Sequence, residues 1–130
     1  MLGVYLSGTG NTRHCITKLL SLLDPDASLI PIESRDAAER IRNEDTIFLA
    51  YPTQFSNIPF MIRDFINTNS SIWEGKKVFC LTTMGAFSGD GTGVISEALK
   101  HKSVFGAVYG AITVNRNIIA RTYGPLILIM

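Results

Sequence analysis

A short segment near the start of the chain carries the side chains with the clearest chemical potential. Residues 7–12 read Ser-Gly-Thr-Gly-Asn-Thr, and a helical pattern follows directly. Hydroxyl and amide groups donate hydrogen bonds, small residues let an anion approach backbone N–H groups, and a helix N-terminus adds partial positive charge. The segment therefore predicts a phosphate-binding loop, whose candidate residues are Ser7, Gly8, Thr9, Gly10, Asn11 and Thr12.

The kind of phosphate follows from what this loop lacks. A P-loop NTPase needs a lysine at the end of its glycine loop, whereas the first lysine here is Lys18, inside the predicted helix. A dinucleotide-binding loop needs a third glycine for close helix–strand packing, and Arg13 stands at that position. Glu33 does lie at the distance of a ribose-binding acid, so this alternative stays open. The hydroxyl-rich loop fits a single phosphate best and indicates a nucleotide-sized ligand.

Apolar runs alternate with helical patterns along the chain. Strands are expected at residues 2–6, 29–32, 46–51, 78–83 and 105–113, and helices at 12–23, at 36–42, from Pro59 onward and at 92–102. The helix after the phosphate loop presents one apolar face, made of Ile16, Leu19, Leu20 and Leu23. Strands that alternate with helices predict a doubly wound parallel sheet, in which ligands bind beyond the carboxyl ends of the strands.

Two later segments begin at the carboxyl ends of the third and fourth expected strands. Residues 51–59 read Tyr-Pro-Thr-Gln-Phe-Ser-Asn-Ile-Pro, and residues 82–91 read Thr-Thr-Met-Gly-Ala-Phe-Ser-Gly-Asp-Gly. Together with the first loop, they resemble the FMN-binding loops of flavodoxins, and most resemble flavodoxin domains often joined to a ferredoxin module. The resemblance covers about residues 2–113. It implies a flavodoxin-like α/β three-layer sandwich, with a five-stranded parallel sheet in the order 2-1-3-4-5 and helices on both faces.

The resemblance also implies FMN as the cofactor, with its phosphate in the first loop and its ring held by the two later loops. The candidate residues in these later loops are Pro52, Thr53, Gln54, Phe55, Ser56, Asn57, Thr83, Met84, Gly85, Ala86, Phe87 and Gly91. Phe55 and Phe87 could stack on the ring or pack the bases of their loops. Related sequences usually have an aromatic residue and then glycine where this chain has Ser56 and Asn57. Asparagine adopts a left-handed backbone less readily than glycine, so a peptide flip toward the flavin at Asn57 would be hindered.

Three functions are compatible with these residues. The first is an electron carrier between redox partner proteins, with a ferredoxin or its reductase as candidate partners. The alternative is an FMN-dependent oxidoreductase acting on a small substrate such as a quinone, and the third is a non-catalytic assembly domain with a vacant site. The sequence has no Ser-His-Asp or Cys-His arrangement and no metal-ligand pattern, so no catalytic or metal-binding residues are expected.

The remaining composition predicts a single domain over residues 1–130. A net charge of +1 without a Lys/Arg cluster predicts neither a nucleic acid nor a membrane as partner. The chain shows no signal-peptide pattern, and Cys15 and Cys80 are expected to be reduced, buried thiols, which together predict a cytoplasmic protein. The last helix of the fold is expected to be missing or altered. The apolar residues 124–130 should instead pack on the sheet or in a homodimer.

Overall fold

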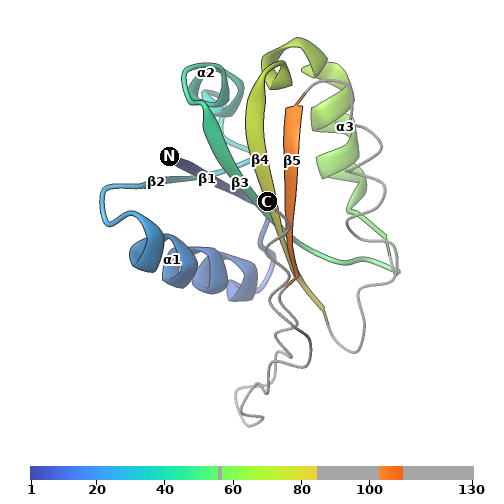
Figure 1. Ribbon diagram of the computed structural model, residues 1–130. Helices are drawn as coiled ribbons and strands as arrows, with labels where there is room; N and C mark the ends of the chain where they lie inside the picture. Colours follow the sequence, from blue (N-terminus) through green and yellow to red (C-terminus); the bar gives the residue numbers. More distant parts are fainter. Residues whose placement is uncertain (56, 85–102, 110–130) are drawn as a thin grey trace, which may run out of the picture.

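The computed structural model describes residues 1–55, 57–84 and 103–109, and its centre is a parallel sheet (Figure 1). The strands are β1 (Leu2–Tyr5), β2 (Ser28–Pro31), β3 (Thr46–Pro52), β4 (Lys76–Thr83) and β5 (Ser103–Tyr109). They lie in the order β2-β1-β3-β4-β5, and every neighbouring pair is parallel. The predicted strand order is therefore confirmed. The expected helix at 92–102, the end of the fifth strand at 110–113, the altered last helix and the apolar tail lie outside the described residues.

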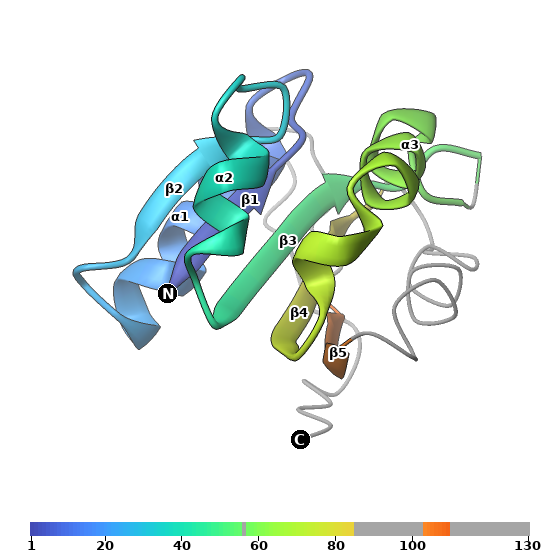
Figure 2. The same cartoon turned by 90° about the horizontal axis from the view of Figure 1, so that it is seen from above.

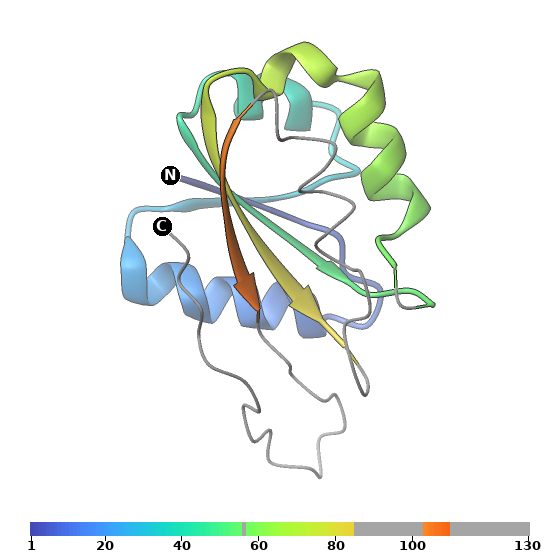
Figure 3. The same ribbon diagram turned by 45° about the vertical axis from the view of Figure 1, so that its right-hand side comes forward.

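The helices form layers on both faces of the sheet (Figures 2 and 3). Helix α1 (Asn11–Leu23) covers one face, and the other face carries α2 (Ala37–Arg42), α3 (Phe60–Thr68) and the short 3-10 helix η1 (Ser70–Trp73). Among the described residues, the buried apolar side chains form two clusters, one on each face of the sheet. Cys15, Ile16 and Leu20 of α1 form one apolar cluster with Phe48, Ala50 and Leu81 of the sheet. A larger cluster joins the opposite sheet face to the other helices. The predicted three-layer arrangement is confirmed for the described part of the chain.

Close contact between β1 and α1 depends on the glycine at position 3. A Cβ atom at Gly3 would lie 2.4 Å from Leu20 Cδ1 and 2.7 Å from Leu29 Cδ1, so a larger residue would force these leucine side chains to shift. Leu23, the last residue of α1, is 54% exposed. The apolar face that contacts the sheet therefore ends at Leu20, one turn earlier than the sequence predicted. This packing places the N-terminus of α1, and with it the predicted phosphate loop, at the carboxyl end of β1.

Strand β4 starts two residues before its predicted position because a lysine is buried at its first residue. The side chain of Lys76 is 7% exposed, and its Nζ donates hydrogen bonds to the carbonyl oxygens of Arg42 at 3.0 Å and Glu44 at 2.6 Å. These carbonyls belong to the last residue of α2 and the segment just after it, where a cation is favoured. The Lys76 ammonium group is therefore hydrogen-bonded although it is buried. For this reason β4 can begin at Lys76, a residue that the hydropathy pattern places in a loop.

The connection between α3 and β4 is held by the aromatic ring of Trp73. This ring is fully buried and meets Phe65 edge-on, with 6.3 Å between the ring centroids. Ile62 and Ile66 of α3 are also buried. Within residues 1–55 and 57–84, no helix combines the length and apolar character needed to cross a bilayer.

Candidate functional site

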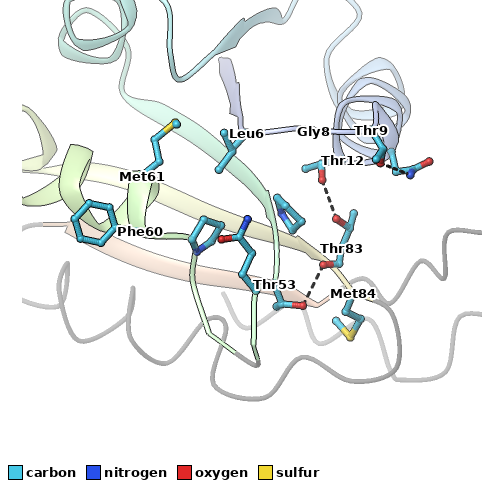
Figure 4. A pocket seen from close by; sticks show the side chains of 13 residues that line it. Leu6, Gly8, Thr9, Thr12, Thr53, Phe60, Met61, Thr83 and Met84 are labelled. Atoms are coloured by element: carbon cyan, nitrogen blue, oxygen red, sulfur yellow. Dashed lines mark hydrogen bonds between the residues drawn. The ribbon is translucent and has the colours of Figure 1, made fainter.

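A cavity of about 730 Å³ opens at the carboxyl ends of β1, β3 and β4. Figure 4 shows its lining side chains, which come from the ends of these strands, the loops that follow them and the first turns of α1 and α3. The lining residues are Leu6, Gly8, Thr9, Asn11, Thr12, Pro52, Thr53, Gln54, Pro59, Phe60, Met61, Thr83 and Met84. Nine of these were predicted site residues, so the fold brings three separate sequence segments to one cavity, as expected at this edge of a parallel sheet.

The loop between β1 and α1 leaves backbone N–H groups available for an anion. Gly10 is the N-cap of α1 with a left-handed φ of 91°, and it makes no side-chain capping bond. The Ser7 hydroxyl oxygen accepts the Arg13 N–H at 3.3 Å, and the Asn11 amide donates to the Thr9 hydroxyl at 2.7 Å. The first turn of α1 contains no acidic residue. The helix N-terminus therefore offers donors without a carboxylate to repel an anion.

Within the described residues, neither the backbone conformation nor the packing at position 8 requires glycine. Its φ lies outside the left-handed range, and a Cβ atom built there would meet no protein atom within 4 Å. Gly8 nevertheless lines the cavity. The absence of a side chain at Gly8 leaves its backbone accessible from the cavity.

Three threonines connect the loops at the polar end of the cavity. The hydroxyl oxygens of Thr12 and Thr83 lie 2.8 Å apart in a buried hydrogen bond. The carbonyl oxygen of Thr83 accepts the Thr53 N–H at 2.8 Å and the Thr53 hydroxyl at 3.3 Å. Figure 4 shows these bonds joining the start of α1, the end of β4 and the loop after β3. The polar end of the cavity is thus one hydrogen-bonded unit drawn from three segments.

The loop after β3 makes a tight turn that projects an aromatic ring into solvent. Gln54 and Asn57 exchange two backbone hydrogen bonds, each 2.9 Å long. Phe55, between them, has a left-handed φ of 50° and a fully exposed side chain. The Phe55 ring therefore does not pack the base of its loop. Of the two roles expected for it, stacking on a ligand stays a prediction. A left-handed backbone is unfavourable for a bulky residue.

Asn57 is held from two sides in this turn. Its carbonyl oxygen accepts the Gln54 N–H, and its side-chain Oδ1 accepts the Ile58 N–H at 2.8 Å and the Arg63 guanidinium at 3.3 Å. A flip of the peptide that follows Asn57 would break two hydrogen bonds, the one from the Gln54 N–H to the Asn57 carbonyl and the one from the Ile58 N–H to the Asn57 side chain. The flip stays a prediction, and the loss of these two bonds would oppose it.

The opposite end of the cavity is apolar, and sequence analysis missed it. Pro59, Phe60 and Met61, at the start of α3, line this end, and Phe60 and Met61 are 77% and 47% exposed (Figure 4). The available signal was the pair Phe60–Met61, which directly follows a proline at a helix start. Because the inward positions of α3 are Ile62 and Ile66, these two apolar side chains are left on the outer surface of the helix.

Some predicted site residues lie apart from the cavity or outside the described chain. Ser7, Gly10, Phe55 and Asn57 belong to the loops that border the cavity without lining it themselves. Ser56, Gly85, Ala86, Phe87 and Gly91 lie outside the described residues. Of the second predicted ring-binding loop, the described structure therefore includes the first residues, Thr83 and Met84.

The described lining of the cavity contains no ionisable side chain. A phosphate there would be held by hydroxyl, amide and backbone N–H dipoles rather than by a cation. The two cysteines lie elsewhere, buried in the two apolar clusters. Burial raises the pKa of the Cys15 thiol and raises the pKa of Cys80 to about 12, against the opposing effect of a hydrogen bond with Tyr51. Both thiols are therefore protonated and unreactive near neutral pH.

Comparisons with known proteins support the fold. No protein-family model matches the chain, and no curated protein matches it in sequence. Solved structures do match. Flavodoxin from Megasphaera elsdenii is 18% identical, with 91% of this chain and 90% of that chain covered and a TM-score of 0.73. A flavodoxin, WrbA-like protein from Agrobacterium tumefaciens is 18% identical, with 88% and 84% covered and a TM-score of 0.74.

A third similar structure was solved with a ligand. Flavodoxin from Fusobacterium nucleatum, bound to flavin mononucleotide, is 17% identical, with 80% of this chain and 67% of that chain covered and a TM-score of 0.63. The chain therefore has the flavodoxin-like fold, as its three loops predicted. The ferredoxin module suggested by the wording of those loops stays a prediction.

Proposed function

We propose that this protein binds FMN in the cavity and carries electrons between redox partner proteins. The observation that supports this most directly is the division of the cavity into two unlike ends. Thr12, Thr83 and the N-terminus of α1 lie on one side of the cavity, and the apolar side chains of Phe60 and Met61 lie on the other (Figure 4). A mononucleotide such as FMN likewise has a charged phosphate at one end and a large flat ring at the other.

The chemistry of the described lining residues suits FMN. Gly8, Thr9, Asn11 and Thr12 would hold the phosphate through hydrogen bonds, and the neutral lining suits an anion held by dipoles. Thr53, Gln54 and Met84 would contact the ring, and Phe55 is free to cover it. Bound FMN would supply one- and two-electron redox chemistry, while the protein orients it and sets its surroundings.

The test is a titration of the purified protein with FMN and with riboflavin, followed by the visible flavin absorbance. We expect FMN to bind one-to-one and more tightly than riboflavin, which lacks the phosphate. Gly8→Ala is the matched variant. It should weaken FMN binding while leaving the free energy of unfolding unchanged or raised by up to about 1 kcal/mol. A protein that takes up neither flavin would instead be the non-catalytic assembly domain.

A second candidate function is an FMN-dependent oxidoreductase, and one observation favours it. The exposed Phe60 and Met61 beside the cavity offer an apolar surface on which a small substrate such as a quinone could rest. Steady consumption of reduced nicotinamide in the presence of a quinone would support the oxidoreductase. A flavin-loaded protein that exchanges electrons with a redox protein but consumes no nicotinamide would support the carrier.

A further inference from the structure

The buried pair formed by Thr12 and Thr83 joins residues that are 71 positions apart in the sequence. Thr12 belongs to the first turn of α1, and Thr83 is the last residue of β4. Their side chains are 2% and 4% exposed, and both line the cavity. The hydroxyl of Thr83 therefore sits behind the phosphate loop without belonging to it (Figure 4).

The donors and acceptors of this pair allow two arrangements. Each hydroxyl has one proton to donate and two lone pairs to accept with, and either oxygen can be the donor of the 2.8 Å bond. One proton of the two is used within the pair. The hydroxyl that accepts this bond keeps its own proton free for a ligand in the cavity.

An anion in the phosphate loop selects one of these arrangements. A phosphate can only accept hydrogen bonds, so a hydroxyl that faces it must turn its proton toward it. Thr12 is the member of the pair that stands at the helix N-terminus, where the other predicted phosphate donors gather. Its proton then points at the phosphate, and its oxygen is left to accept the proton of Thr83.

We propose, building on the proposed FMN site, that Thr83 is a positioning residue for phosphate recognition. It donates to the Thr12 oxygen and thereby holds the Thr12 proton toward the phosphate. The carbonyl of Thr83 in turn is fixed by two bonds from Thr53, which keeps the donor in place. Recognition at the first loop thus depends on a residue of the fourth strand.

The neighbouring residue provides a matched control. Thr82 is fully buried on the same strand, and its hydroxyl has no hydrogen-bond partner in the described structure. Because successive residues of a strand point to opposite faces, Thr82 points away from Thr12. Thr82→Val removes the same atoms as Thr83→Val without touching the pair.

The experiment measures FMN and riboflavin affinities for Thr83→Val, Thr83→Ser, Thr12→Val, the Thr12→Val/Thr83→Val double variant and Thr82→Val. Thr83→Val should weaken FMN binding about ten-fold and change riboflavin binding by less than two-fold, a factor of ten being about 1.4 kcal/mol. Thr83→Ser, which keeps the hydroxyl, should bind FMN like the wild type, and so should Thr82→Val. The double variant should bind FMN no more weakly than Thr12→Val alone, because Thr83 acts through Thr12.

Several results would overturn the inference while leaving the proposed function intact. These are wild-type FMN affinity in Thr83→Val, an equal loss for FMN and riboflavin, or an additional loss in the double variant. The last result would mean that Thr83 contacts the phosphate directly. A wild-type protein that binds no FMN would overturn the proposed function as well. Unfolding midpoints of all variants, measured without flavin, separate a folding defect from a binding defect.

Discussion

The loop after β1 and the loop after β3 border the same cavity but are built in opposite ways. The first consists of small polar residues, accommodates its left-handed backbone at Gly10, and is linked through Thr12 to β4. The second places its left-handed backbone at Phe55 and exposes that ring completely. In the proposed FMN site, the first loop would recognise the charged phosphate, whereas the second places a strained backbone at Phe55 and exposes an apolar ring. Strain of this kind gathers at functional sites.

The sharpest test of this contrast removes a hydroxyl from the first loop. Thr12→Ala should weaken FMN binding about ten-fold or more, because one hydrogen bond to a charged group contributes roughly 1.5–3 kcal/mol. Riboflavin binding should hardly change. Titrations followed by flavin absorbance measure both affinities, and equal losses for the two flavins would show that this loop does not recognise charge.

The corresponding test of the second loop removes its ring. Phe55→Ala should weaken FMN and riboflavin binding by the same factor, about two- to ten-fold, because a stacked aromatic contact contributes about 0.5–1.5 kcal/mol. Phe55→Tyr keeps the ring and should bind both flavins like the wild type. If only FMN binding suffers in Phe55→Ala, the two loops do not divide their roles as described.

The smallest expected effect concerns the backbone strain itself. Phe55→Asn should raise the free energy of unfolding by up to about 1 kcal/mol, because asparagine tolerates a left-handed backbone better than phenylalanine. Phe60→Asn is the control, since Phe60 is also exposed but begins a helix. Urea unfolding of the flavin-free proteins measures both variants. A gain in Phe60→Asn as large as that in Phe55→Asn would point to lost surface hydrophobicity rather than to relieved strain.

Much of the fold follows from patterns that are local in the sequence. The apolar runs around β1, β3 and β4, and the helical face of Ile16 and Leu20, depend on side-chain spacing within one element. The start of β4 was placed two residues late because the burial of Lys76 depends on carbonyls of Arg42 and Glu44, more than thirty residues away. A hydropathy pattern contains no information about such distant partners.

The candidate site also has features that depend on neighbouring residues and features that depend on distant ones. The sequence by itself determined the position of the first loop and of the strand ends that border the cavity, because loop composition and the alternation of strands and helices are patterns of neighbouring residues. Only the tertiary structure decided that Phe60 and Met61 stand beside the cavity, that Phe55 adopts a left-handed backbone, and that the hydroxyls of Thr12 and Thr83 meet. These features arise from the register of β3 against β4 and from the packing of α1 and α3. Such relations exist only once distant segments are brought together.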